Sequence, residues 1–301
     1  MYYSSFNKFH EVAIEENNEP KVKPAEIDGD LTKSSSAEGN SEAKPESTKD
    51  RQESMGIIEK IIRTIIDLIS KMFQKYGGII DALNSNSDGS FIKNYNEKKR
   101  NYKPNVPIKV PTYRCDDAPA ERALNNMRTF VREATNLLNS TAYGAKHDDN
   151  SILEVEDEEF VKRVLKKLNA PERCKTFQEY LNYLKEVCKG QKAYIVINES
   201  DLAGYEKVAL LRGDALKMKI RTDLANANEI TTKVRNNLKL VSSSKSDNLS
   251  KETRKRAEKY SRRMHKIATY YNDFLDTYMH IKVNKINVAR AILNTVYSIK
   301  L

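Results

Sequence analysis

A chain of 301 residues can form one large or two ordinary domains, and its 31% charged and 39% hydrophobic content places it on the polar side of globular proteins. Ten glycines and eight prolines are too few for the frequent turns of a β-sandwich or barrel. Three cysteines without a CxxC spacing fit neither a disulfide framework nor a structural zinc site, and we find no signal peptide and no transmembrane segment in the sequence. We therefore predict a mainly α-helical protein of a reducing compartment.

Residues 1–54 are predicted to be a disordered acidic leader. They contain 12 Asp/Glu against 7 Lys/Arg, and the segment KSSSAEGNSEAKPESTKD has almost no apolar side chains to offset the entropy lost on folding. The whole chain has 52 Lys/Arg and 42 Asp/Glu, so 45 basic and 30 acidic residues lie beyond the leader. The leader and the remainder therefore have opposite net charge.

Residues 55–83 are predicted to form an amphipathic, isoleucine-rich helix. In MGIIEKIIRTIIDLISKMFQKYGG the apolar positions follow two adjacent 3-4 spacings, which gives a face wider than a coiled-coil seam. This isoleucine stripe consists of Ile58, Ile61, Ile62, Ile65, Ile66, Leu68, Ile69, Met72 and Phe73. It can pack on the body of the same chain or a second copy, in a groove of a different protein, or on an anionic membrane surface. Because the stripe is rich in Ile rather than in the aromatic residues of interfacial helices, we predict docking on protein.

Residues 84–111 are predicted to be an extended spacer. Three prolines, Pro104, Pro107 and Pro111, disfavour helical backbone at the residues that precede them, and the flanking segment NYNEKKRNY is polar. The isoleucine-rich helix would then be detached from the body of the chain.

Residues 112–301 are predicted to be a basic α-helical body with at most one short strand pair. Three helix starts are marked by capping residues: Asp116 or Asp117, Ser151 with Glu154, and Thr176 with Glu179. The segment KAYIVI is the one persuasive strand, because it is β-branched and aromatic. We expect a helix over 203–241 and one or two long helices over 249–299.

The last of these helical segments has an apolar seam and a basic face. The seam steps 3-4-3-4 through Ala257, Tyr260, Met264, Ile267, Tyr271, Phe274, Tyr278 and Ile281. The basic face carries Lys251, Arg254, Lys255, Arg256, Lys259, Arg262, Arg263 and Lys266. None of these cations lies on the seam. We interpret them either as solvated helix surface or as a phosphate-contacting, nucleic-acid-binding face.

No catalytic, cofactor-binding or metal-binding constellation is recognised in the sequence. The four histidines stand apart, with no HExxH, no GxGxxG and no P-loop. The acidic segment EVEDEEF at 154–160 is better explained by favourable charge in the first turn of a helix than by a metal site. We therefore expect no enzymatic activity, no cofactor and no small-molecule substrate.

The layout of acidic leader, isoleucine-rich helix and basic helical body resembles virion-internal and head-associated structural proteins of large tailed bacteriophages. In those families a protease often trims the leader after glutamate in small-x-Glu sequences. Here AIE, ending at Glu15, and SAE, ending at Glu38, lie inside the leader. The resemblance implies a component that is packaged with DNA or built into the capsid or tail.

Two hypotheses follow. The first is a non-enzymatic structural and interaction protein, located in a virion or in the host cytoplasm, whose helix 55–76 docks on other structural proteins or on copies of itself. The alternative is a nucleic-acid-binding protein that uses the basic face of 251–266, with DNA as its partner.

Overall fold

The computed structural model describes residues 48–88, 90–137, 151–211, 213–242 and 250–298. These residues contain eight helices and one two-stranded antiparallel sheet, which confirms the prediction of a mainly helical fold with a single strand pair. The helices are α2 (Thr48–Asp88), α3 (Ser90–Asn101), α4 (Ala118–Leu137), α5 (Asp157–Lys167), α6 (Phe177–Lys189), α7 (Glu199–Ala209), α8 (Gly213–Ser242) and α9 (Lys251–Ser298), and the strands are β1 (Ile108–Tyr113) and β2 (Lys192–Ile197). Residues 1–47 of the predicted leader, including the processing residues Glu15 and Glu38, lie outside the described residues. Helix α2 begins at Thr48, inside the range predicted for the leader.

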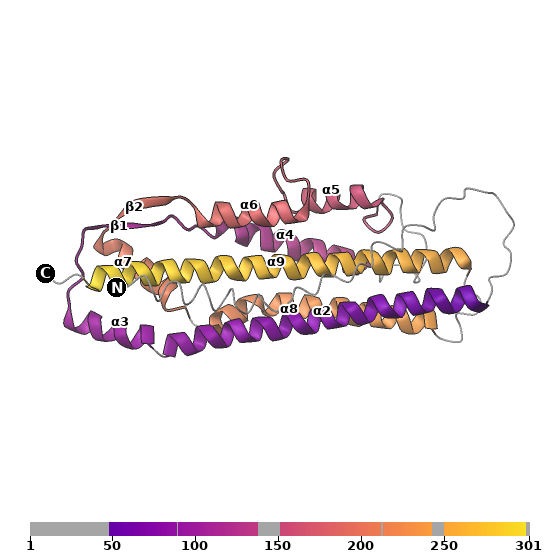
Figure 1. The fold of residues 1–301 in the computed structure, drawn as a ribbon, viewed down its shortest axis with the longest axis horizontal. Helices are drawn as coiled ribbons and strands as arrows, with labels where there is room; N and C mark the ends of the chain where they lie inside the picture. The colour runs from indigo at the N-terminus through magenta and orange to yellow at the C-terminus, as the bar shows by residue number, and fades with distance from the viewer. Residues whose placement is uncertain (1–47, 89, 138–150, 212, 243–249, 299–301) are drawn as a thin grey trace. The chain divides into compact units, whose positions relative to one another are not determined.

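The last helix, α9, is the element on which the others pack (Figure 1). It is one helix of 48 residues, as the prediction for 249–299 allowed, and at 1.5 Å per residue it is about 70 Å long. All eight residues of the predicted apolar seam are buried. Contacts join α9 to α2, α3, α4, α6, α7, α8 and β1. No helix within the described ranges is long and apolar enough to cross a membrane.

The isoleucine stripe is covered by the chain itself, so the prediction of a detached helix is wrong. Figure 1 shows α2 alongside α8 and α9. Ile58, Ile61, Ile62, Ile65, Ile69 and Met72 are buried in the main core, while Ile66 and Leu68 are partly buried against it. The side chain of Phe73 lies outside the described residues. The Tyr76 hydroxyl donates to the carbonyl oxygen of Asn272 at 3.2 Å, which fixes α2 on α9. Of the partners considered for the stripe, the body of the same chain is therefore the one that the structure shows.

The prediction that residues 84–111 form an extended spacer is also wrong, because most of these residues lie in helices or in a strand. Helix α2 continues to Asp88, α3 spans Ser90–Asn101 and β1 begins at Ile108. Two aromatic residues one turn apart, Phe91 and Tyr95, give the polar helix α3 enough apolar surface to pack. Tyr95 is buried with its ring centroid 5.5 Å from that of Tyr297 on α9. Two aromatic anchors thus outweigh the polar composition that suggested an extended chain.

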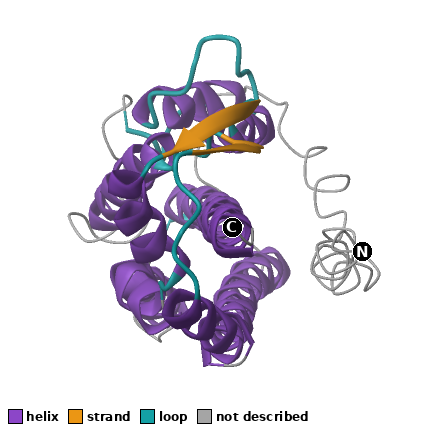
Figure 2. Ribbon diagram, turned by 90° about the vertical axis from the view of Figure 1, so that its left-hand side faces the viewer, coloured by secondary structure: helices purple, strands orange, loops and turns teal. Residues whose placement is uncertain are grey.

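The two strands pair antiparallel, from Ile108 opposite Ile197 to Tyr113 opposite Lys192. The predicted strand KAYIVI is confirmed, and its partner lies in the segment that we expected to be a spacer. Pro111 is tolerated there because β1 is an edge strand that needs backbone donors on one side only. Val110 and Ile197 form a second core with the C-terminal part of α9. Figure 2 shows the sheet lying over the helices.

The predicted helix starts are correct at two of three places. Asp116 Oδ1 accepts the N–H of Ala118 at 3.0 Å at the start of α4, and Thr176 forms its capping box with Glu179 before α6. The Ser151 box is wrong, because α5 begins only at Asp157. The acidic residues of 157–159 do occupy the first turn of α5, as expected.

The helix predicted over 203–241 is interrupted, since α7 ends at Ala209 and α8 begins at Gly213. The start of α7 was not predicted either. There the carboxylate of Asp201 accepts the N–H of Asn198 at 2.9 Å.

Truncation of the stripe tests whether α2 and α9 unfold together. Ile65 is fully buried, so Ile65→Ala should lower the free energy of unfolding by about 2–5 kcal/mol. Hydrogen exchange measured by mass spectrometry should show lost protection in α9 as well as in α2. The exposed Ser70→Ala on the same helix should change the stability by less than about 0.5 kcal/mol. Unaltered exchange in α9 would contradict the packing of α2 on the body.

A glycine after α6 is required by backbone geometry. Gly190 has φ 67° and ψ −174°, a region open to glycine alone, and an added Cβ would lie 2.2 Å from the carbonyl oxygen of Arg114. Gly190→Ala should therefore cost at least about 1–3 kcal/mol in denaturant unfolding. The control Gly204→Ala, in the exposed interior of α7 with no atom near the added Cβ, should stabilise by about 0.5–1 kcal/mol. Equal unfolding midpoints for the two variants would refute this assignment.

Candidate functional site

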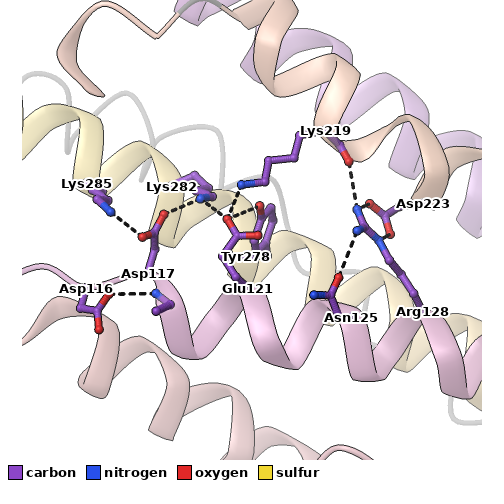
Figure 3. Close-up of polar contacts among 11 residues, drawn as sticks. Asp116, Asp117, Glu121, Asn125, Arg128, Lys219, Asp223, Tyr278, Lys282 and Lys285 are labelled. Atoms are coloured by element: carbon purple, nitrogen blue, oxygen red, sulfur yellow. Dashed lines mark hydrogen bonds and ion pairs between the residues drawn. The ribbon is translucent and has the colours of Figure 1, made fainter. Parts of the chain in front are cut away.

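A connected group of charged side chains lies where α4, α8 and α9 meet (Figure 3). We call this group the charge lock. Its members are Asp117 just before α4, Glu121 and Arg128 on α4, Lys219 and Asp223 on α8, and Tyr271, Tyr278, Lys282 and Lys285 on α9. The contacts run in order along the helices, so α4 and α8 are both antiparallel to α9.

One end of the charge lock pairs two carboxylates with lysines of α9. Asp117 accepts from both Lys282 and Lys285, and Glu121, one turn further on, accepts from Lys282. Burial alone would raise the pKa of the Asp117 carboxyl, but the hydrogen bonds from the two lysines outweigh it and lower this pKa to about 2. Burial would likewise lower the pKa of the Lys282 ammonium, but its bonds to Asp117 and Glu121 raise it. These groups are therefore fully charged at neutral pH.

Glu121 also connects α4 to α8. It accepts from Lys219 on α8, and the Tyr278 hydroxyl donates to it at 3.0 Å. Burial would raise the pKa of Glu121, but the hydrogen bonds of Lys219 and Lys282 lower it. Burial and the nearby Glu121 charge raise the pKa of Tyr278, so the hydroxyl stays neutral and remains a donor.

The other end of the charge lock is centred on Asp223, whose side chain is fully buried. Arg128 donates to both of its oxygens at 2.7 Å, and the Tyr271 hydroxyl donates to Oδ1 at 2.7 Å. Arg128 also donates to the carbonyl oxygen of Lys219 at 2.9 Å. The hydrogen bonds to Asp223 raise the pKa of Arg128. Three donors around one buried carboxylate compensate the cost of its desolvation.

The chemistry of the charge lock is that of a fixed contact. A general acid or base works best with a pKa close to the operating pH. Here the pKa values of Asp117 and Glu121 are shifted down and those of Lys282, Tyr271 and Tyr278 are shifted up, away from neutrality. Within the described ranges, no group of three or more His, Cys, Asp or Glu side chains is placed to hold a metal ion.

The predicted nucleic-acid-binding face of 251–266 is divided by the fold. Arg263 is buried: it pairs with Asp157, donates to the carbonyl oxygen of Val155 at 2.6 Å and lies 4.7 Å from the ring centroid of Phe160. Lys259 donates to the carbonyl oxygen of Glu154. These cations therefore bind the segment that leads into α5 and the start of α5 itself.

The remaining cations of this face occupy different environments. Arg254 is buried, and Lys266 lies 5.7 Å from the Phe160 ring centroid. Arg256 and Arg262 pair with Glu252 and Glu258 one turn away on α9. Lys251 and Lys255 are exposed. The expectation that all eight cations lie outside the packed surface is wrong for Arg254 and Arg263, because α9 is buried on more faces than its seam alone covers.

The charge lock was not predicted from the sequence. One available signal was Lys285, which occupies the next position of the 3-4 spacing after Ile281, before apolar residues resume at Val288 and Ile292. A charged residue in such a seam requires a partner when the helix is packed. Its partner Asp117 lies 168 residues away, and this pairing cannot be deduced from helical spacing.

The pH dependence of unfolding tests the charge lock. The pKa of Asp117 is about 2 in the folded protein and close to 3.8 when unperturbed, so its stabilising contribution is present above about pH 4 and is lost as the pH falls toward 2. Asp117→Asn should lower the free energy of unfolding at pH 7 by about 1–3 kcal/mol and should flatten its decline between pH 4 and pH 2.

Asp67→Asn, which removes an exposed carboxylate from α2, serves as the matched control. It should leave both the stability at pH 7 and the acid profile close to those of the unmodified chain. Unfolding curves recorded by circular dichroism at each pH supply the measurement. An Asp117→Asn profile that coincides with the control would refute the structural role of this carboxylate.

Comparison of the chain with models of protein families, with curated proteins and with solved structures found no match in any of the three.

Proposed function

We propose that the chain is a non-enzymatic structural and interaction protein, which acts by presenting a fixed helical surface to other macromolecules. The observation that carries this proposal is the charge lock. Its paired charges hold three helices together, and its contacts keep Asp117, Glu121 and Lys282 each in a single protonation state near neutral pH. Such a network favours a rigid assembly over proton transfer.

The partners of this protein bind outside the isoleucine stripe. Six of the nine stripe residues are buried in the core of the same chain, so they do not dock on another protein while the core is intact. Other structural proteins or copies of the chain must instead meet surfaces formed by the outer sides of the helices and the sheet.

The setting that we propose is a bacteriophage particle, in its head, interior or tail. Support for it comes from the layout of the chain, in which an acidic segment containing Glu15 and Glu38 precedes a basic helical body. A long helical unit with internally paired charges suits a component that must persist inside an assembled particle.

Purification of particles from the source of the sequence tests this function. Particles separated on a density gradient should contain the chain at a constant ratio to the major capsid protein, as measured by quantitative peptide mass spectrometry. A host protein of similar abundance, followed in the same fractions, serves as the control for carry-over. If the chain stays with that soluble control and is absent from the particles, the virion role is wrong.

A further inference from the structure

The two faces of the β1–β2 sheet differ in exposure. Val110, Thr112 and Ile197 point to the core and are buried. The opposite face, which we call the outer sheet face, consists of Lys109, Pro111, Tyr113, Lys192, Tyr194 and Val196, all of them exposed. Tyr194 is 67% exposed and Val196 is 52% exposed. Large apolar side chains that remain this accessible on a sheet often mark a binding surface.

Cations accompany both tyrosines of the outer sheet face. The Lys109 ammonium lies 5.3 Å from the ring centroid of Tyr194, and the ammonium of Lys189, at the end of α6, lies 5.2 Å from that of Tyr113. Lys192, opposite Tyr113, adds a third cation. The six residues of the face include neither Asp nor Glu, so the surface combines aromatic rings with positive charge.

The spacing of the two rings restricts the shape of a ligand. Tyr113 is paired with Lys192, two residues from Tyr194, so the tyrosines are diagonal neighbours on one face. Diagonal neighbours in an antiparallel pair are about 7–8 Å apart. This exceeds the separation of about 3.4 Å between successive base pairs of a duplex. The face therefore fits a strand whose bases are unstacked from one another.

We propose that the outer sheet face binds single-stranded nucleic acid. Tyr113 and Tyr194 stack on bases, while Lys109, Lys189 and Lys192 contact phosphates. The inference rests on the proposed function, since it names a partner for a protein that acts by binding. Exposed aromatic rings combined with cations are a recurrent means of holding single strands without base-specific hydrogen bonds.

Charge complementarity favours this occupant over a second copy of the chain. Two copies joined through this face would bring at least three lysines of each close to those of the other, with no carboxylate on the face to neutralise them. A polyanion gains from the same lysines. Its bases also cover the tyrosine rings, which an acidic peptide without aromatic groups leaves exposed.

The test uses the full chain and dye-labelled oligothymidine and oligouridine, with affinity measured by fluorescence anisotropy. Tyr113→Ala and Tyr194→Ala should each weaken binding by about 5- to 150-fold, which corresponds to the loss of one stacked base. Tyr113→Phe and Tyr194→Phe keep the rings and should remain within about twofold of the unmodified chain. Circular dichroism and thermal unfolding establish that each variant is folded.

Salt dependence tests the lysines. Log affinity should fall linearly with log salt, and three phosphate contacts on a single strand should contribute about −2 to the slope. The triple variant Lys109→Gln, Lys189→Gln and Lys192→Gln should remove this contribution. The matched control is Lys251→Gln with Lys255→Gln, two exposed cations of α9 that should leave the slope unchanged. If this control removes the binding and the sheet variants do not, nucleic acid binds α9 and the inference is wrong.

Three further outcomes would also overturn the inference. They are no binding of either oligonucleotide at low salt, tighter binding of a duplex of the same length, and complete competition by polyglutamate of equal charge. Association with particles is a separate readout that does not use these residues. Particle association without single-strand binding would reject this inference alone, whereas single-strand binding by a chain that is absent from particles would reject the virion role alone.

Discussion

Burial of α9 on several sides is the constraint on which the rest of the structure depends. A helix with one apolar seam needs a single neighbour, but α9 also buries Arg254, Arg263 and Lys282 among its apolar residues. Each of those cations requires a compensating group within the protein, because an uncompensated buried charge is very costly. The elements around α9 therefore have to supply two things, apolar surface for the seam and hydrogen-bond acceptors for the cations. Helix α2 supplies mainly the first, and the segments that lead into α4 and α5 supply the second.

The two kinds of contact determine different properties of the packing. Apolar burial between α2 and α9 is large but weakly directional, so it decides which faces meet. The ion pairs have defined distances and decide how the helices are aligned along their axes. A shift of α4 by one turn, about 5.4 Å, would not preserve the present set of contacts that Asp117 and Glu121 make with Tyr278, Lys282 and Lys285. The combination explains how long helices, which can slide along a continuous stripe, adopt one arrangement.

Sequence patterns predicted the elements whose signals are local. The seam of α9, the capping box of Thr176 and the strand KAYIVI all depend on residues within one or two turns of each other, and the structure has them as predicted. Sequence patterns gave wrong predictions where the structure depends on contacts between residues that are far apart in the sequence. Tyr95 packs α3 against α9 through its contact with Tyr297. Arg263 is buried because Asp157, more than 100 residues away, supplies its ion-pair partner. The charge lock was not predicted for the same reason, because its residues come from three separate segments that only the fold brings together.

The pairing of β1 with β2 has a consequence for the kinetics of folding. Tyr113 lies opposite Lys192, so the strands close a loop that contains α4, α5 and α6. The entropy cost of closing a loop grows with its length, and pairings between distant segments are correspondingly slow to nucleate. The intervening helices shorten this loop when they collapse, because helices and their local contacts form much faster than such a ladder. The sheet should therefore be a late event, formed after α4 and α6 have met, and the outer face that it carries exists only in chains that have completed this step.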